Sequence, residues 1–440
     1  MAFTIDKQTL DDLNLPGKFK NNSIFSLFNT THTRGGEILL EQMFSQPLTD
    51  ATAINRRAQR FAYFGQKQMT FPVKKELLET VEHYLSRAAH PNRYVALLNT
   101  CRRKFLNYIA TDKEYEIICT GLIGCVGFLN TWKDFNNTLD DDSAYEDIRR
   151  EIQNILAMPA LAGLLEKKDI TRLSWWEMAR YDHLLRATCL SQLKRLMDIV
   201  YETDIYLAVS HIARQYHFTA ATAYSGDKKK KFISVKGLFH PRLPEAVTND
   251  MEITPEQNVV FLTGANMAGK STFMKSFAIT VYLGHMGFPV AAREMSFTVQ
   301  DGLYTSINVS DNLNLGYSHF YAEVLRVKHI AREVAAGKNL VVIFDELFKG
   351  TNVKDAYDAT VAVTEAFSAH RNCSFIISTH ITEAGTTLQQ RCSNFRFVYL
   401  PTVMEGSRPT YTYRLAAGIT DDRHGMMIIR NEGIVEIINR

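Results

Sequence analysis

The chain has 440 residues, of which 46% are hydrophobic and 22% charged, and its formal net charge is +3. This is the balance of an ordinary globular protein, long enough for about two to four domains. The charge is too close to neutral to identify a partner, so a nucleic-acid binder of this composition must concentrate its positive charge on one face.

The cysteines and the apolar segments exclude further classes of protein. Six cysteines are scattered without a CxxC pair or a neighbouring histidine cluster, which argues against a zinc site and a disulfide framework. The N-terminus "MAFTIDKQTLDDLNLPGKF" lacks the apolar core of a signal peptide. The longest apolar run, residues 117–129, contains three glycines and is shorter than the roughly 20 residues of a bilayer span. We therefore expect a buried helix there, no membrane segment and a cytoplasmic location.

The hydrophobic pattern changes once along the chain. Residues 1–21 are predicted to form an N-terminal strap. Over residues 22–227, apolar residues mostly recur three and four apart, as in "RGGEILLEQMFSQPL", which is typical of helices with one apolar face. Over residues 228–440, the apolar runs "VVFLTG", "LVVIFDE" and "CSFIISTH" are each followed by a helical pattern. This alternation predicts a mostly parallel sheet, so the expected fold is α plus α/β: an all-helical domain followed by an α/β domain.

The stretch "GANMAGKS", Gly264 to Ser271, has the pattern G-x-x-x-x-G-K-[ST]. Glycines let the backbone curl so that successive N–H groups point at phosphate oxygens. In this pattern Lys270 supplies a positive charge to the outer phosphates, and the Ser271 hydroxyl is a ligand for Mg²⁺. An apolar strand pattern precedes the loop and a helical pattern follows it, which argues against a chance match and predicts a nucleotide site.

Two further predicted strands end in polar residues. "LVVIFDE" ends in Asp345 and Glu346, and "FIISTH" ends in His380. Such side chains lie at the sheet edge where ligands bind in open α/β folds. Asp345 is predicted to hold Mg²⁺, directly or through water, and Glu346 to act as general base on an attacking water. The alternatives are a strand that simply stops at a charged turn, and a structural histidine in place of one that reaches the γ-phosphate or the attacking water.

These motifs, in this order, resemble those of the MutS family of DNA mismatch-repair ATPases, a branch of the ABC-type ATPases. "TGANMAGKSTFMKS" is similar to the family's T-G-x-N-M-[AG]-G-K-S-T-x-[ML], "FDELFKGTNVKDA" to its D-E-[IL]-x-x-G-T-x-x-x-[DE]-[GA], and "STHITE" to its [AS]-T-H-[YF]-x-E. "DNLNLGYSHFYAEV" resembles the family's signature loop, and residues 23–61 resemble the start of its core (lever) domain. The resemblance is strong over residues 236–440, weaker over 22–80 and 200–235, and almost untraceable over 85–195.

The resemblance implies an ATPase that uses ATP and Mg²⁺. It implies catalytic roles for Glu346, His380 and Lys270, and Mg²⁺ ligands in Ser271 and Asp345. In the signature loop, Gly316 and Ser318 would approach the nucleotide of a second subunit, which implies a homodimer formed through the ATPase domains. The ATP-binding residues carried over are Gly264, Ala265, Asn266, Met267, Ala268, Gly269, Lys270, Ser271 and Thr272, with Val247 beside Ala246 at the adenine position, where the family usually has an aromatic residue.

The chain also departs from the family pattern. It enters directly at the core domain, so we expect a short member without the mismatch-recognition and connector domains and without their Phe-x-Glu reader. The helical stretch looks too short for long levers with a DNA clamp, and we also expect the chain to lack the terminal helices that reinforce dimers in the family. His424-Gly425 stands where the family usually has Ser-Tyr-Gly.

Basic residues that would contact DNA are few. The candidates are Arg102, Arg103 and Lys104 in one cluster, and Lys228, Lys229, Lys230 and Lys231 in the dense lysine run. A lysine run is more often a solvated turn than a DNA contact. The mixture of aromatic and basic residues in "SWWEMARYDHLLR" suits nucleic acid, but such residues more often pack helices together. DNA binding is therefore implied by the resemblance.

Two functions from different classes follow from these observations. The first is an ATP-dependent DNA-binding protein of the MutS type, acting in mismatch repair, recombination or branched-DNA handling, in which ATP switches a dimeric clamp and other repair proteins are further partners. The second is a nucleotide-switched protein-interaction module that does not bind DNA directly, which the near-neutral charge favours. A degenerate pseudo-ATPase is a third interpretation, opposed by the joint presence of Lys270, Asp345, Glu346 and His380. No motif assigns a role to residues 85–195.

Overall fold

The computed structural model describes residues 2–16, 22–87, 102, 113–141, 143–167, 174–226, 231–307, 319–405, 408–420 and 437–438. The chain divides into two compact units. Met1–Phe28, Gln42–Ala62 and His211–Arg440 form unit 1, and Asn29–Glu41 and Tyr63–Ser210 form unit 2. These bounds differ from the predicted ranges 1–21, 22–227 and 228–440. The reason is that the N-terminal segment and the strand at residues 221–224 pair with strands of the α/β part.

Among its described residues, unit 2 contains helices and the loops that join them, and no strand. It contains α5 (Lys75–Ser86), α7 (Lys113–Asn137), α8 (Glu146–Leu156), α9 (Pro159–Leu165), α10 (Trp175–His183) and the π-helical turn η2 (Leu184–Thr188), with parts of α3 (Arg34–Ser45), α4 (Ala51–Lys67) and α11 (Leu190–Gln215). The apolar run 117–129 lies in α7, where Leu122, Val126 and Leu129 are fully buried. Gly121 lets α7 approach α5, because a Cβ there would lie 2.3 Å from the ring of Tyr84. Among the described residues, no helix is long and apolar enough to cross a membrane.

Unit 1 carries two sheets. The larger sheet has the order β12-β9-β4-β8-β7-β6, and its pairings are parallel except that of β12 with β9. The smaller sheet has the order β1-β5-β2-β3, and β10 and β11 form a separate hairpin. The strands are β1 (Ala221–Tyr224), β2 (Ile233–Leu238), β3 (Asn249–Ile253), β4 (Val259–Gly264), β5 (Glu294–Thr298), β6 (Gly302–Ser306), β7 (Leu340–Phe344), β8 (Ser374–Ser378), β9 (Phe395–Leu400), β10 (Thr402–Glu405), β11 (Arg408–Tyr411) and β12 (Ala416–Ala417). The helical unit and the mostly parallel sheet confirm this part of the predicted fold class.

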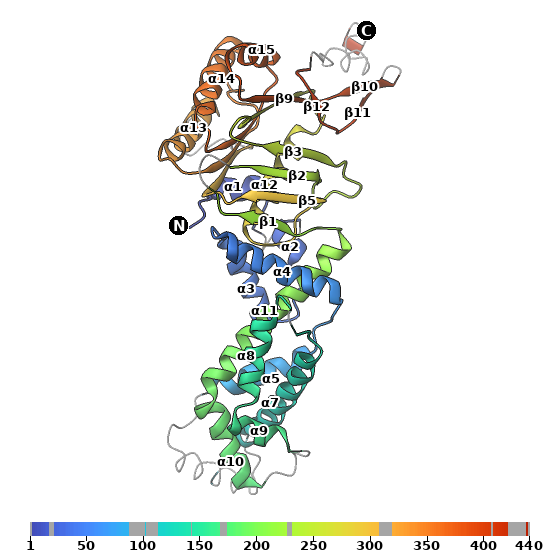
Figure 1. The fold of residues 1–440 in the computed structure, drawn as a ribbon, viewed down its shortest axis with the longest axis vertical. Helices are drawn as coiled ribbons and strands as arrows, with labels where there is room; N and C mark the ends of the chain where they lie inside the picture. The colour runs from blue at the N-terminus through green and yellow to red at the C-terminus, as the bar shows by residue number, and fades with distance from the viewer. Residues whose placement is uncertain are drawn as a thin grey trace. The chain divides into compact units, whose positions relative to one another are not determined.

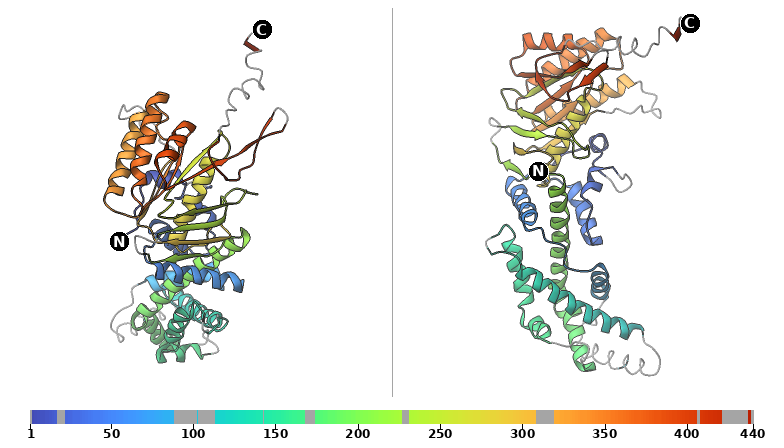
Figure 2. Two further views of the ribbon diagram at one scale, coloured as in Figure 1. Left: turned by 45° about the horizontal axis from the view of Figure 1, so that its top comes forward. Right: turned by 90° about the vertical axis from the view of Figure 1, so that its right-hand side faces the viewer.

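Helices cover both faces of the six-stranded sheet. α12 (Lys270–His285) contacts β4 and β7 of this sheet and also β1 and β2 of the smaller one, so it lies between the two sheets. Nearly every residue of α12 is buried, which explains why its sequence is apolar on all sides. The opposite face is covered by α13 (His319–Ala335), α14 (Val353–Ser368) and α15 (Thr382–Arg391), drawn together in orange to red (Figures 1 and 2).

The N-terminal segment is attached to the edge strand β6. The backbone N–H of Thr4 donates to the carbonyl oxygen of Asp301 at 2.8 Å, and the N–H of Leu303 donates to the carbonyl of Thr4 at 3.0 Å. The short helix α1 (Lys7–Asp12) follows, capped by Asp6, and α2 (Ile24–Phe28) comes next along the chain. The predicted strap is therefore part of unit 1, held by the sheet from its first residues.

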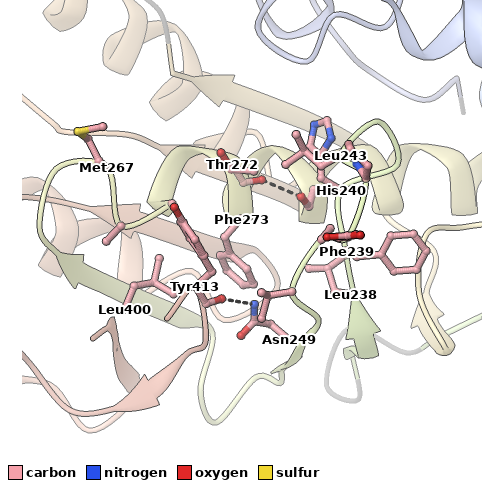
Figure 3. Close-up of a pocket in the computed structure, with 17 residues that line it drawn as sticks. Leu238, Phe239, His240, Leu243, Asn249, Met267, Thr272, Phe273, Leu400 and Tyr413 are labelled. Carbon is pink, nitrogen blue, oxygen red and sulfur yellow. Dashed lines mark hydrogen bonds between the residues drawn. The ribbon is translucent and has the colours of Figure 1, made fainter. Parts of the chain in front are cut away.

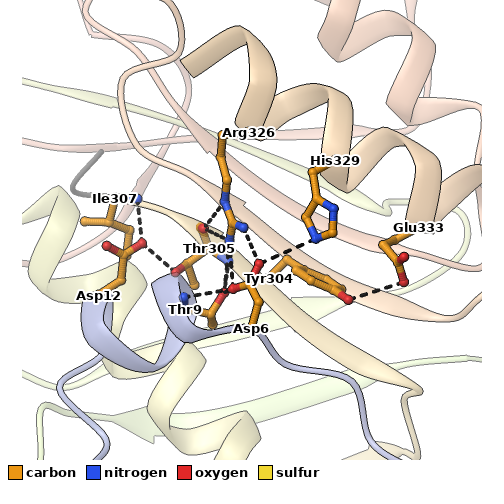
Figure 4. A network of polar contacts seen from close by, with 9 residues as sticks. All are labelled: Asp6, Thr9, Asp12, Tyr304, Thr305, Ile307, Arg326, His329 and Glu333. Atoms are coloured by element: carbon orange, nitrogen blue, oxygen red, sulfur yellow. Dashed lines mark hydrogen bonds and ion pairs between the residues drawn. The ribbon is translucent and has the colours of Figure 1, made fainter. Parts of the chain in front are cut away.

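A network of polar contacts fastens the same segment to α13 (Figure 4). Arg326 of α13 forms an ion pair with Asp6 and donates to the carbonyl oxygen of Thr305 from Nε at 3.1 Å and from a terminal nitrogen at 2.5 Å. Asp12 accepts from the hydroxyl of Thr305 at 2.7 Å and from the backbone N–H of Ile307 at 3.0 Å. One segment thus ties the end of β6 to the middle of α13.

Candidate functional site

Sheet topology brings the three sequence motifs to one edge. β4 lies next to β8, and β8 lies next to β7, with all three strands parallel. Each of these strands ends where a motif begins: β4 at Gly264, β7 before Asp345 and β8 before His380. Because the carboxyl ends of parallel strands meet at the same edge, residues separated by more than 100 positions become neighbours.

The loop between β4 and α12, residues 264–271, has the backbone that its glycines predict. Gly264 has a φ of +141° and Gly269 a φ of +99°, and Gly269 caps α12. Met267 also has a positive φ, of +70°. The Nζ of Lys270 donates to the carbonyl oxygens of Gly264 at 2.8 Å and Ala265 at 3.0 Å, so the amine lies across the loop. The loop therefore ends on a helix N-terminus, whose free N–H groups favour an anion.

Asp345 lies at the centre of a small oxygen cluster. Its two carboxylate oxygens accept hydrogen bonds of 2.5 Å from the hydroxyls of Ser271 and Ser378. A hydroxyl and a carboxylate side by side are oxygen ligands of the kind that Mg²⁺ takes when phosphates supply the rest of its shell. No group of three or more histidine, cysteine or acidic side chains that would hold a metal by themselves occurs in the described part of the chain. The cluster fits a magnesium ion shared with a nucleotide and not a protein cage.

Glu346 and His380 are in direct contact. Nε2 of His380 lies 2.5 Å from Oε1 of Glu346, and Nζ of Lys349 lies 3.9 Å from Oε2. Glu346 itself has a φ of +55°, and its backbone N–H donates to the carbonyl and hydroxyl of Ser378 at 3.1 and 3.2 Å. The hydrogen bond with His380 is the main cause that holds the pKa of Glu346 below its usual value, although burial acts in the opposite direction. The carboxylate is thus kept ionised.

A pocket of about 520 Å³ opens beside the loop (Figure 3). Ala246 and Val247, the residues proposed at the adenine position, line it together with Met267 and Thr272 of the loop segment. Tyr413, which no sequence motif indicates, lines the same pocket, and its ring comes within 3.0 Å of where a Cβ on Gly269 would lie.

The position of Tyr413 depends on a residue far from it in the sequence. The side chain of Asn249 donates to the carbonyl oxygen of Tyr413 at 2.9 Å and accepts from the N–H of Leu415 at 2.7 Å. Tyr413 is 46% exposed and has a φ of +55°. In the family that the motifs resemble, an aromatic residue usually occupies the adenine position, but nothing in the local sequence near residue 413 indicates that its ring reaches the loop.

Several predicted site residues lie outside the described segments. These are Gly316, Ser318, Arg103, Lys104, Lys228, Lys229 and Lys230. Of the remaining basic candidates for DNA contact, Arg102 is exposed, whereas Lys231 is only 7% exposed and offers little surface to a phosphate backbone.

Part of the aromatic and basic segment at residues 174–186 packs inside unit 2, while Arg180 is exposed. Arg186 is buried and forms a paired contact with Asp182, with Nε 2.7 Å from Oδ1. The hydroxyl of Tyr84 donates to the same oxygen at 2.8 Å, and Arg186 lies over the Tyr84 ring. Trp176, by contrast, is 47% exposed. Core packing therefore accounts for Arg186, which is not available to a nucleic acid.

The structure defines a class of protein with a helical unit and an α/β unit whose sheet gathers a glycine loop, two acidic residues and a histidine at one edge. Two family models match the chain: MutS domain III over residues 8–213 and MutS domain V over residues 260–440. The chain therefore belongs to the MutS family, which confirms the resemblance drawn from its motifs.

Individual relatives agree with this assignment. The chain is similar to the DNA mismatch repair protein MutS of Lactococcus lactis subsp. lactis, with 27% identity over 251 residues, 56% of this chain and 29% of the relative. The corresponding protein of Fusobacterium nucleatum is 30% identical over 292 residues, 62% of this chain and 31% of the relative. The corresponding protein of Caldicellulosiruptor saccharolyticus is 31% identical over 242 residues, which are 53% of this chain and 27% of the relative. The match spans less than a third of the length of each relative.

Proposed function

We propose that this chain binds and hydrolyses ATP at the carboxyl edge of the six-stranded sheet and uses the nucleotide to switch a MutS-type protein on DNA. The observation that carries the proposal is the convergence of Lys270, Ser271, Asp345, Glu346 and His380 at that edge. The relatives named DNA mismatch repair protein support DNA as the partner.

The loop and the pocket beside it support ATP binding. The triphosphate would lie along residues 264–271, where backbone N–H groups, the helix N-terminus and the Lys270 amine all favour negative charge. The base would enter the pocket between Val247 and the ring of Tyr413, because aromatic faces stack on bases. Ser271 and Asp345 would hold Mg²⁺, which neutralises charge on the phosphate oxygens when it is bound.

Hydrolysis would use Glu346 as the base. The oxygen of a water molecule forms a bond to the γ-phosphorus, Glu346 takes up the proton of that water, and the bond to the ADP oxygen breaks to release ADP and phosphate. His380 contacts Oε1 of Glu346 and keeps the carboxylate ionised, so Oε2, which lies 3.9 Å from Nζ of Lys349, would take up the proton. Lys270 remains with the phosphates as their positive partner.

A homodimer completes the proposal. Gly316 and Ser318 belong to the segment that resembles the family's signature loop, and in the proposed arrangement they approach the nucleotide of the second subunit. A γ-phosphate shared between two subunits would close the ATPase domains, and its loss on hydrolysis would release them. DNA binding would depend on that closed state.

Two measurements test the proposal. Lys270→Ala and Glu346→Gln should each abolish ATP turnover, and unchanged turnover in either variant would contradict the site assignment. Fluorescence anisotropy with perfect, mismatched and branched duplexes, with and without ATP and at two salt concentrations, tests the DNA part. Nucleotide-dependent affinity that falls steeply with salt is expected, because phosphate contacts release counterions.

A protein-interaction module that does not contact DNA is the second candidate. The observation that favours it is that Lys231 and Arg186, two basic residues in segments that are candidates for contacting DNA, are both buried. ATP hydrolysis without affinity for any of the three DNA forms would move the assignment to this candidate.

A further inference from the structure

The turn that follows β7, residues 345–351, has an unusual backbone. Glu346 has a φ of +55° and Phe348 a φ of +62°, both in the left-handed region. Bulky residues rarely adopt this region, and they remain there only when the surrounding structure holds them. The turn carries the proposed general base, so what holds it bears on the reaction.

The first turn of α13 packs directly on this turn. The side chain of Phe348 is only 4% exposed, and its ring lies edge-on to that of Phe320, with 6.1 Å between ring centroids. Two positions along, a Cβ on Gly350 would lie 2.9 Å from the backbone nitrogen of Phe320. The buried ring and the missing Cβ both follow from one close approach between the turn and α13.

α13 is itself held in place further along. Arg326, six positions after Phe320, is 8% exposed and is bound to Asp6 of the N-terminal segment and to the carbonyl oxygen of Thr305 (Figure 4). α13 cannot slide along the sheet without breaking these contacts. Phe320 is therefore presented to Phe348 from a helix whose position is fixed.

The other side of the turn is held by β8. The N–H of Glu346 donates to Ser378, and its carboxylate contacts His380. Glu346 thus lies two residues from Phe348, in a turn clamped between β8 and α13. A shift of Phe348 would be passed to Glu346 through a backbone that has few other conformations.

We propose that Phe348 is a positioning residue, which sets the carboxylate of Glu346 for water activation through its contact with Phe320. The inference rests on the proposed ATPase activity. It separates turnover from nucleotide binding, because neither Phe320 nor Phe348 lines the pocket beside the loop, whereas Lys270 and Ser271 belong to α12.

A matched set of leucine variants tests the inference by activity. Phe348→Leu and Phe320→Leu should each lower kcat about tenfold, because small misplacements of a catalytic group are costly, with the Kd for ATP within about twofold of the original. The double variant should turn over no more slowly than the single ones, because both remove one contact. Phe395→Leu is the control, since Phe395 is 7% exposed in the same hydrophobic cluster and lies away from the turn. An equal kcat in Phe348→Leu and Phe395→Leu, or additive losses in the double variant, would overturn the inference.

Hydrogen–deuterium exchange of the nucleotide-free protein provides a readout that needs no turnover. Phe320→Leu should speed exchange of the peptide 344–351 by roughly fivefold, the order expected when one aromatic pair is lost, while Phe395→Leu should leave it unchanged. Unchanged exchange in Phe320→Leu would show that α13 does not hold the turn. A protein that binds ATP without hydrolysing it overturns the proposed function instead, and the exchange measurement still decides on the contact.

Discussion

Ser378 offers a direct test of how the acidic cluster is supported. Ser378→Ala removes the hydroxyl that donates to Asp345 at 2.5 Å, from a side chain that is fully buried. Hydrogen bonds to charged groups contribute about 1.5–3 kcal/mol to stability. Asp345 is only half-buried, so water replaces part of the lost hydrogen bond, and we expect the free energy of unfolding to fall by about 1–2 kcal/mol. The turn itself should persist, because the N–H of Glu346 keeps the carbonyl of Ser378 as its acceptor at 3.1 Å.

The effect on magnesium should exceed the effect on stability. With one of its two hydroxyl partners removed, Asp345 loses the contact that orients it toward Ser271, and changes of this kind weaken metal affinity or activity about 10–100-fold. Urea unfolding measures the change in the free energy of unfolding, and a Mg²⁺ titration of ATP turnover measures the change in the affinity for Mg²⁺. Ser374→Ala, at the other end of β8, is the control. A lower unfolding free energy with an unchanged Mg²⁺ dependence would refute the argument that Asp345 is a magnesium ligand positioned by Ser378.

Three further predictions concern pH, the N-terminal segment and the base pocket. The lowered pKa of Glu346 depends first on its hydrogen bond with His380, so the ionised carboxylate stabilises the fold above the usual pKa of 4.5, and this contribution is lost as the pH falls through the lowered pKa. In His380→Ala the pKa of Glu346 should rise, and the acid limb of the kcat profile should move to higher pH. An unchanged acid limb would contradict the pairing. Arg326→Ala removes the guanidinium that pairs with Asp6 and donates to the carbonyl of Thr305, while Asp6 keeps its hydrogen bonds from Thr9. Urea unfolding should therefore show a loss of about 2–4 kcal/mol in the free energy of unfolding, less than for a fully buried pair, against little change in exposed Arg332→Ala; equal losses would contradict the role of the network. Tyr413→Ala should weaken ATP binding roughly tenfold or more in a fluorescence titration, as expected for loss of a stacked base, whereas Tyr224→Ala, outside the pocket, should not; similar affinities would place the base elsewhere.

Local sequence patterns carried much of the site. The loop 264–271 was predictable because its glycines, lysine and serine act through the backbone of one short segment. Asp345, Glu346 and His380 were placed at one edge because parallel strands align their carboxyl ends, and the observed pairing of β4, β8 and β7 brings them together. The family was identified from the same motifs, since they are contiguous in the chain.

Contacts between distant segments were decided only by the tertiary structure. Asp6 and Arg326 are 320 positions apart, so no local pattern shows that the N-terminal segment belongs to the α/β unit. Tyr413 lies beside the loop in a segment whose backbone Asn249 binds, and Phe348, with a φ of +62°, packs against Phe320 of α13. Amino-acid types and their spacing determine what a short segment is able to do chemically. Which segments meet is settled by burial and hydrogen bonding summed over the whole fold, and a sequence motif does not contain that sum.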